Sequence, residues 1–182
     1  MRLITPSLEY IHGYRDAIKR GWFPDGTADG AARTLSQIES APESFLKRFD
    51  DPQGEAEPVR LPDGSFAPRV GWFGKWMWDG EFSGRIALRW PLEGTQLPDV
   101  FLGHIAYEVV PWKQKRGYAT EALAEFLPEA RKRGFHFVEI VTSADNLASQ
   151  LVIMANGGVF VERFQKLPVN GGGEAFRYRI DL

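Results

Sequence analysis

The sequence predicts an α/β (α+β mixed) domain, in which helices cover both faces of a mixed sheet of six to seven strands. Three observations lead to this fold class. Short apolar runs recur along the chain with turn residues between them. Apolar residues at helical spacing separate several of these runs. The stretch 100–142 has the order strand, helix, strand, and such a crossover joins parallel strands, whereas hairpins join antiparallel ones.

The totals favour one globular domain, and we expect residues 1–182 to form it. The net charge of −2 argues against a general nucleic-acid-binding protein, which needs a basic face. The chain has no cysteine, which excludes disulfides, thiolate metal sites and a cysteine nucleophile. No apolar run approaches the ~20 residues of a membrane helix, and no signal peptide is recognisable. We therefore expect a cytoplasmic protein with no membrane partner.

The N-terminal part is predicted to form one strand and two helical segments. Residues 1–4 form a short strand. Ser7 is a good N-cap for a helix that continues to Ile18 with apolar residues at helical spacing. Residues 31–49 form a second helix, or equally well two shorter ones, because Pro42 interrupts the pattern.

A polar loop and a hairpin follow. Residues 50–68 are rich in Pro, Gly and Asp and are expected to form a surface loop with a turn at Asp63-Gly64. Apolar and aromatic residues dominate the next two runs, which predict strands at 70–78 and 81–90. The dipeptide Asp79-Gly80 between them is a hairpin turn signal.

Strands and helices alternate in the remainder of the chain. The expected elements are strand 100–110, helix 117–133, strand 135–142, helix 146–155, and a final hairpin of strands 159–164 and 176–180.

The stretch from Gly103 to Glu121 combines three features of a site for a phosphorylated ligand. A strand ends at a proline, a basic turn follows, and a helix opens at Gly117. The first N–H groups of a helix are unpaired and its dipole favours negative charge. Gly117 permits close backbone approach, and Ala119 is small. Three basic residues add positive charge: Lys113, Lys115 and Arg116. Taken alone, the turn could equally be an ordinary solvated one.

A second motif lies downstream, and it favours the phosphate site over an ordinary solvated turn. Asn146-x-x-Ser149 opens a helix that ends at Gly157-Gly158. Together with the loop Gln-Lys-Arg-Gly-Tyr-Ala at 114–119, it makes the chain resemble the GNAT superfamily of acyl-CoA N-acyltransferases, in a branch of predicted acetyltransferases. The loop fits the family's Q/R-x-x-G-x-G/A pyrophosphate motif, and the helix fits its second conserved helix. The clear resemblance covers roughly residues 84–182.

The resemblance implies the GNAT fold, in which the two central parallel strands splay apart and acetyl-CoA (CoA) lies across their ends as co-substrate. The pantetheine arm then bonds an open strand edge, as an added strand would. The implied cofactor-binding residues are Val109, Val110, Gln114, Lys115, Arg116, Gly117, Tyr118, Ala119, Thr120, Asn146 and Ser149. Lys115 and Arg116 could instead face solvent, Asn146 could also be an ordinary N-cap, and Ser149 a small packing residue.

The resemblance implies that a primary amine attacks the thioester directly. It therefore implies that the protein is an N-acetyltransferase. The acceptor is expected to be an amine on a small molecule or peptide, and the protein a monomer or homodimer. Many relatives carry a tyrosine as general acid at the position of Ile153. Its absence keeps open a non-catalytic acyl-CoA-binding or regulatory module, and an enzyme for a larger acyl group is a third hypothesis. Tyr118 and Tyr178 are possible substitutes for the acid.

Two residues of the central strand are candidates for the general base. His104 and Glu108 share one strand face with Ala106 between them. Histidine titrates near neutrality and suits the role. A hydrogen-bonded structural histidine and an arginine-paired carboxylate are the competing interpretations, and Glu139 is a third choice. The Val109 N–H is the expected oxyanion donor. No metal is expected, because no metal-ligand spacing is present.

Tryptophans could line the acceptor side. Trp72, Trp76 and Trp78 alternate along one strand, and Trp22 lies in a preceding loop. Such a cleft could hold an amine by cation–π contact. The competing interpretation is a bulky strand face that packs on a helix.

Overall fold

A computed structural model describes residues 1–24, 26–56, 61 and 64–182. The helices are α1 (Ile11–Lys19), α2 (Ala28–Ser40), α3 (Pro42–Lys47), α4 (Tyr118–Lys132) and α5 (Leu147–Ala155), with short 3₁₀ turns η1 (Pro111–Lys113) and η2 (Pro168–Asn170). The strands are β1 (Arg2–Ile4), β2 (Asp50–Asp51), β3 (Val70–Trp78), β4 (Phe82–Pro91), β5 (Ile105–Val109), β6 (Phe137–Ser143), β7 (Val159–Gln165) and β8 (Glu174–Asp181).

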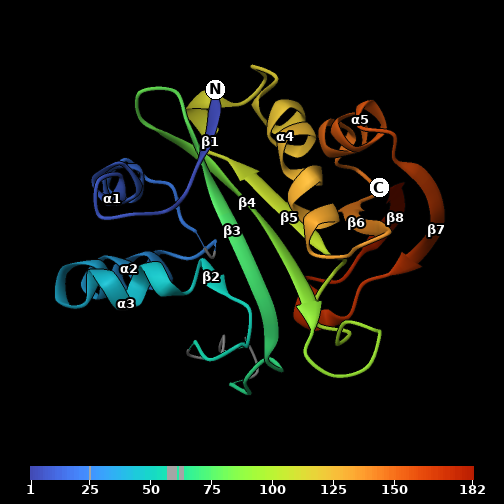
Figure 1. The fold of residues 1–182 in the computed structure, drawn as a ribbon, viewed down its shortest axis with the longest axis horizontal. Coiled ribbons are helices and arrows are strands. Elements are labelled where there is room, and N and C mark those ends of the chain that lie inside the picture. Colours follow the sequence, from blue (N-terminus) through green and yellow to red (C-terminus); the bar gives the residue numbers. More distant parts are fainter. Residues whose placement is uncertain (25, 57–60, 62–63) are drawn as a thin grey trace.

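The strands form two sheets, which Figure 1 shows as separate groups. The first has the order β1-β3-β4-β5, with β2 also paired to β3, and the second has the order β6-β8-β7. The predicted α/β class is confirmed, but its strand detail differs. Each pairing within these sheets is antiparallel, and the single mixed sheet that the crossover predicted is divided between β5 and β6.

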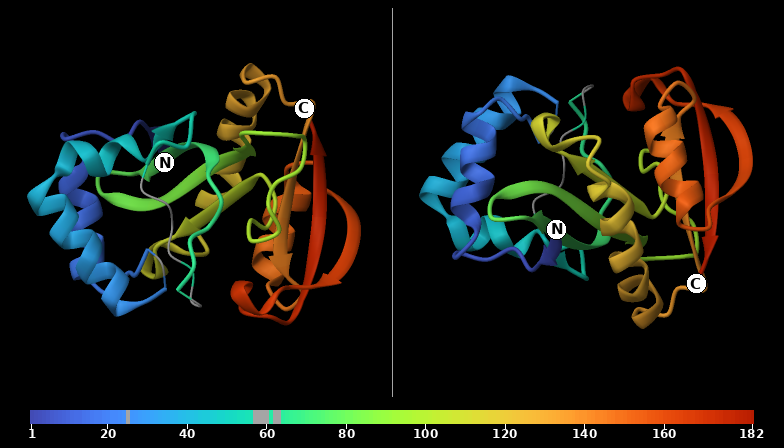
Figure 2. Two further views of the ribbon diagram at one scale, coloured as in Figure 1. Left: turned by 90° about the horizontal axis from the view of Figure 1, so that it is seen from below. Right: turned by 90° about the horizontal axis from the view of Figure 1, so that it is seen from above.

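Helices cover both faces of the first sheet, as predicted. Helices α1, α2 and α3 lie on one side and α4 on the other, next to the second sheet (Figure 2). One core cluster joins the N-terminal helices to Trp76 and Phe82, and another joins α4 and α5 to residues such as Ile86 and Ile105. Both clusters bury apolar surface against the same strands, which stabilises the sheet from both sides.

The tryptophan cleft is a wrong prediction for three of its four members. Trp22, Trp76 and Trp78 are buried in the first of these clusters, where the Trp22 and Trp76 rings pack against Tyr14 and the Trp78 ring packs against Tyr10. Large aromatic rings gain more from burial than from lining a wet cleft. The competing interpretation, a strand face packed on helices, is the correct one.

The N-terminal helices differ in detail from the prediction. Helix α1 begins at Ile11, because the Ser7 carbonyl accepts the Tyr10 N–H in a separate turn. Pro42 divides the second helical segment into α2 and α3, so the alternative of two shorter helices is confirmed. Of the turn expected at Asp63-Gly64, Asp63 lies outside the described residues.

Strand β5 is shorter than the predicted 100–110. Gly103 has φ +76° and lies against β6, where a Cβ atom would come 2.6 Å from the Glu139 carbonyl oxygen. This glycine therefore interrupts the extended backbone before Ile105. Among the described residues, no helix is long and apolar enough to cross a membrane.

Candidate active site

The backbone of β5 presents an open edge. Within an antiparallel pair, hydrogen-bonded and non-hydrogen-bonded positions alternate. The Val110 N–H bonds the Ser83 carbonyl and the Arg89 N–H bonds the His104 carbonyl, so the even-numbered residues of β5 face β4. The N–H and C=O groups of Tyr107 and Val109 consequently point away from β4.

Strand β6 has a matching open edge. The Ala144 N–H bonds the Glu174 carbonyl, so the even-numbered residues of β6 face β8. Val141 therefore directs its backbone groups toward β5. No ladder joins β5 and β6 in the described part of the chain. The two strands leave a gap with polar backbone on both sides.

The gap is closed at one end by His104. Its N–H donates to the Glu139 carbonyl at 2.7 Å, and its Nδ1 accepts the Glu139 N–H at 3.0 Å. Its ring meets Phe135 and Phe137 edge-on. Burial lowers the pKa of His104, and the nearby Glu139 carboxylate opposes this shift only in part. His104 is thus mostly neutral near pH 7 and acts as a hydrogen-bond acceptor at the base of the gap.

A cavity of about 250 Å³ occupies the gap. Residues of β5, β6 and α5 line it, and Arg89 and Lys166 reach it from β4 and from the segment after β7. Asn146, Ser149 and Tyr107 are among its lining residues, so two of the predicted cofactor-binding side chains meet here. Arg89, Lys166 and Tyr107 were not among the predicted site residues.

The predicted phosphate loop has the expected geometry. Lys115 and Gly117 have φ +61° and +81°, and Gly117 is the N-cap of α4, with no side chain capping it. The first helical bond is donated by the Glu121 N–H to the Gly117 carbonyl, which leaves the N–H groups before it without helical partners. Lys115 and Arg116 are exposed beside this helix start. The arrangement suits an anion.

Lys113 has a different place from its two basic neighbours. It is buried, and its Nζ donates to both Asp79 carboxylate oxygens and pairs with Glu81 at 2.8 Å. The Tyr118 hydroxyl donates to the same Asp79 at 2.7 Å. Burial would raise the pKa of Asp79, but these hydrogen bonds and the Lys113 charge hold it well below its usual range. Lys113 therefore fixes the loop to the β3–β4 turn.

Asn146 and Ser149 begin α5 at the rim of the cavity. The Asn146 side chain accepts the Ser149 N–H at 3.0 Å, as an N-cap does. The Tyr107 hydroxyl lies 2.8 Å from Ser149 Oγ. Burial raises the pKa of Tyr107 to about 12, although the Ser149 hydrogen bond lowers it in part. Ile153 is fully buried in the core, so no hydroxyl reaches the gap from that position.

Glu108 lies on the opposite face of β5 and is held by two donors. Trp22 Nε1 donates to Glu108 Oε1 at 2.8 Å, and the Arg85 guanidinium pairs with Oε2 at 3.3 Å. Arg85 also lies over the Trp22 ring, 5.4 Å from its centroid. Glu108 remains 40% exposed, so its carboxylate is accessible from the side opposite α4.

The structure separates some of the predicted residues from the gap. Val110 bonds Ser83 through its N–H and Lys113 through its carbonyl, so both its backbone groups are occupied. Gln114 folds back, and its side-chain amide donates to the Val109 carbonyl at 3.2 Å. Tyr118 is bonded to Asp79, and the Tyr178 hydroxyl contacts Gln150 inside the core. In the described residues, no three His, Asp or Glu side chains are placed to hold a metal ion.

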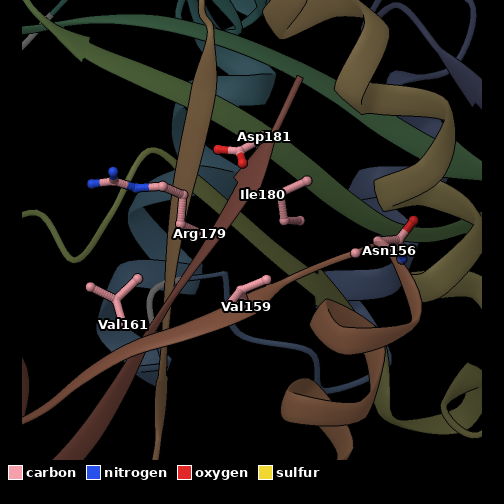
Figure 3. Close-up of a pocket in the computed structure, with 7 residues that line it drawn as sticks. Asn156, Val159, Val161, Arg179, Ile180 and Asp181 are labelled. Carbon is pink, nitrogen blue, oxygen red and sulfur yellow. The ribbon is translucent and has the colours of Figure 1, made fainter.

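A second hollow of about 380 Å³ lies at the end of α5 (Figure 3). Val159 and Val161 come from β7, and Arg179 and Asp181 from β8. None of the predicted site residues lines it. We therefore place the candidate site in the smaller cavity between β5 and β6.

The sequence and the fold both match known proteins. The family described as acetyltransferase (GNAT) domain matches residues 27–159. The microcin C7 self-immunity acetyltransferase MccE, solved with acetyl-CoA and AMP, is 14% identical with a TM-score of 0.61, covering 99% of this chain and 91% of that one. RimL, a ribosomal L7/L12 α-N-protein acetyltransferase solved with coenzyme A, is 12% identical with a TM-score of 0.61, covering 99% and 93%.

An acetyltransferase from Agrobacterium tumefaciens is also similar, with 16% identity, a TM-score of 0.54, and coverage of 99% of this chain and 90% of that one. At these identities the likeness shows the fold. No curated protein matches the sequence significantly.

Proposed function

The chain belongs to the acetyltransferase (GNAT) domain family, and we propose that it transfers an acetyl group from acetyl-CoA to a primary amine. We further propose that residues 1–182 act as one domain, with the donor in the gap between β5 and β6. The observation that carries this placement is the pair of open backbone edges at that gap, which begins beside an uncapped helix start. The acceptor is an amine on a small molecule or peptide.

The donor is held at three points in this proposal. The pyrophosphate lies against the N–H groups at the start of α4, with Gly117 allowing close approach and Lys115 and Arg116 adding charge. The pantetheine amides follow along Val109, as an added strand would. Asn146 and Ser149 border the gap from the α5 side.

The thioester then reaches the cavity, which Tyr107 lines and Val109 does not. Because the Tyr107 N–H also faces the gap, we assign it the oxyanion in place of the Val109 N–H expected from sequence. Val110 supports the site by packing, since its own backbone groups are bonded elsewhere. Gln114 orients the loop through its bond to Val109.

The reaction needs a neutral amine at the thioester carbonyl. The amine nitrogen forms the new C–N bond, the C–S bond breaks, and the proton of the amine passes to a base, directly or through a water molecule. We assign the base to Glu108, whose carboxylate is oriented by Trp22 and Arg85 and is accessible from the acceptor side. His104 remains a second candidate, but its Nδ1 is occupied by the Glu139 N–H.

The leaving thiolate needs a stabilising donor, and Ile153 cannot supply one. Tyr107 lines the cavity, and its hydroxyl stays protonated at neutral pH because its pKa is raised to about 12. A phenol with that pKa is a weak acid toward a thiolate of pKa ~8.5. We therefore assign it a hydrogen bond to the thiolate, without full proton transfer.

Two measurements test the proposal. Titration calorimetry with acetyl-CoA and with CoA should show binding, and a panel of amines should include at least one that is acetylated. Absence of heat and of thermal stabilisation at millimolar acetyl-CoA would contradict the donor assignment. Binding without transfer to any amine would favour the alternative of a non-catalytic acyl-CoA-binding module, which the buried Ile153 motivates.

A further inference from the structure

Of the described residues that line the cavity between β5 and β6, two carry a cationic side chain and none carries a carboxylate. Arg89 reaches it from β4, and Lys166 from the segment that follows β7. Ionised groups in protein interiors are normally paired, because desolvation of a lone charge is costly. Two cations that share a cavity without a counter-charge therefore indicate a site for an anion.

The Arg89 guanidinium has more N–H donors than its hydrogen bonds use. Its Nε bonds the Gly103 carbonyl at 2.7 Å, and one terminal nitrogen bonds the Leu102 carbonyl at 2.8 Å. A guanidinium carries five N–H groups, so three remain. No Asp or Glu in the described residues pairs with it. Burial lowers the pKa of Arg89 to about 10, which still leaves it charged at neutral pH.

The positive charge of Lys166 is likewise not paired with a carboxylate of the described residues. Its Nζ donates to Ser143 Oγ at 2.9 Å, and no carboxylate among the described residues contacts it. Neighbouring cations behave differently, since Arg177 and Arg179 both pair with Glu139. Among the described cations near the cavity, Arg89 and Lys166 therefore differ from Arg177 and Arg179 in having no carboxylate partner.

The anion must come from the acceptor if the proposed function holds. The acetyl group carries no charge, and the phosphates of CoA are assigned to the start of α4, beyond the opposite end of β5. We propose that Arg89 and Lys166 bind the carboxylate of the acceptor, and that the acceptor is a small amino-carboxylic acid. Arginine recognises a carboxylate through paired N–H donors, and lysine adds a point charge.

The test compares amino acids, which carry a carboxylate, with their amides, in which an uncharged carboxamide replaces that carboxylate. The protein is incubated with acetyl-CoA and the nineteen amino acids that carry a primary α-amine, and separately with their nineteen amides, and N-acetylated products are quantified by mass spectrometry. The acids should be acetylated at least about tenfold faster, as expected for charge-assisted hydrogen bonds. Lys166→Gln should reduce this preference, measured as the ratio of the two rates, several-fold. Lys19→Gln, which removes an exposed lysine of α1, is the matched control and should change nothing.

Arg89→Gln should also reduce the preference, but Arg89 holds the Leu102 and Gly103 carbonyls, so its loss can affect folding. Lys166→Gln keeps the inference falsifiable, because within the described residues the Lys166 side chain bonds only the Ser143 hydroxyl. Equal rates for acids and amides, a preference for amides, or no acetylation of either set by protein that binds acetyl-CoA would each overturn the inference. Failure to bind acetyl-CoA would instead overturn the proposed function.

Discussion

Variants at two glycines, one at each end of α4, can distinguish the effect of backbone strain from an effect on ligand binding. Gly117 and Gly134 have φ +81° and +85°, and a Cβ at either would meet no atom within 4 Å. Any other residue is strained at such angles, by about 1–2 kcal/mol. Only Gly117 stands at the proposed phosphate site.

We predict that Gly117→Glu weakens CoA binding at least about tenfold, because it places bulk and negative charge where the phosphates lie. Gly134→Glu should lose similar stability but keep its affinity for CoA. Calorimetric titration of both variants, with thermal unfolding as the stability check, makes the comparison. Equal affinities in the two variants would remove the phosphates from the start of α4.

Glu108 and His104 can be distinguished by turnover. Glu108→Gln should lower kcat by about 10²-fold or more, the range typical of a lost general base, with acetyl-CoA binding unchanged. His104→Asn should retain turnover, because the asparagine oxygen can accept the Glu139 N–H in place of Nδ1. Steady-state kinetics with an accepted amine measures both. The opposite pattern would return the role of base to His104.

His104 should also make stability depend on pH. Its folded-state pKa lies below the ~6.5 of an unfolded histidine. The unfolded chain therefore binds a proton that the folded protein resists, and stability is lost as the pH falls from about 6.5 toward the folded-state pKa. Thermal unfolding should show Tm falling between pH 7.5 and 5 more steeply in the wild type than in His104→Asn. Parallel curves would show that the histidine does not contribute.

Tyr107 and Tyr178 form another matched pair. Tyr107 lines the cavity, whereas Tyr178 is buried with its hydroxyl near Gln150. Tyr107→Phe should lower kcat about tenfold with little change in acetyl-CoA affinity, as expected for one lost hydrogen bond to the thiolate. Tyr178→Phe should leave kcat unchanged. If the two variants have the same kcat as the wild type, the leaving group has another donor or none.

At the scale of elements, the sequence predicts the bounds of β3 and α4 closely. Alternating aromatic residues place β3 at its predicted bounds of 70–78, and Gly117 and Gly134 bracket α4 as expected. Strand β2 was not predicted, because Asp50 and Asp51 carry no apolar pattern and owe their conformation to pairing with β3.

The division into two sheets was not predictable from strand pattern. Periodicity says which face of a strand is buried, but it does not say which edge is paired. The splayed strands came into the prediction only through the family resemblance. The pairing of β8 between β6 and β7 similarly follows from tertiary packing, since the final hairpin alone accounts for only one of its two ladders.

The parts of the candidate site that lie within one short segment of the sequence were predictable. The loop 114–120 and the N-cap Asn146 each have a local signature. Arg89 and Lys166 lie 77 residues apart in the sequence, so no spacing rule brings them together. Tyr107 could have been recognised, because its place between Ile105 and Val109 on one strand face already directed it toward α5.

At the scale of the whole molecule, the gap between the sheets is a consequence of two cores. One core lies against the N-terminal helices, and the other joins α4 and α5 to strands of both sheets. In the part of the chain that the structure describes, helix α4 therefore holds the sheets together without a β5–β6 ladder. This leaves polar backbone exposed at the gap, which a ligand with amides can satisfy.

Amide hydrogen exchange, resolved by residue with NMR, tests this central claim most directly. In the free protein, the amides of Tyr107, Val109 and Val141 should exchange quickly, while those of Ala106 and Glu108, which face β4, exchange slowly. Saturating acetyl-CoA should slow the first three toward the rates of the other two, because the pantetheine arm and the thioester then occupy the gap. If the three amides remain fast with acetyl-CoA bound, the donor does not lie between β5 and β6.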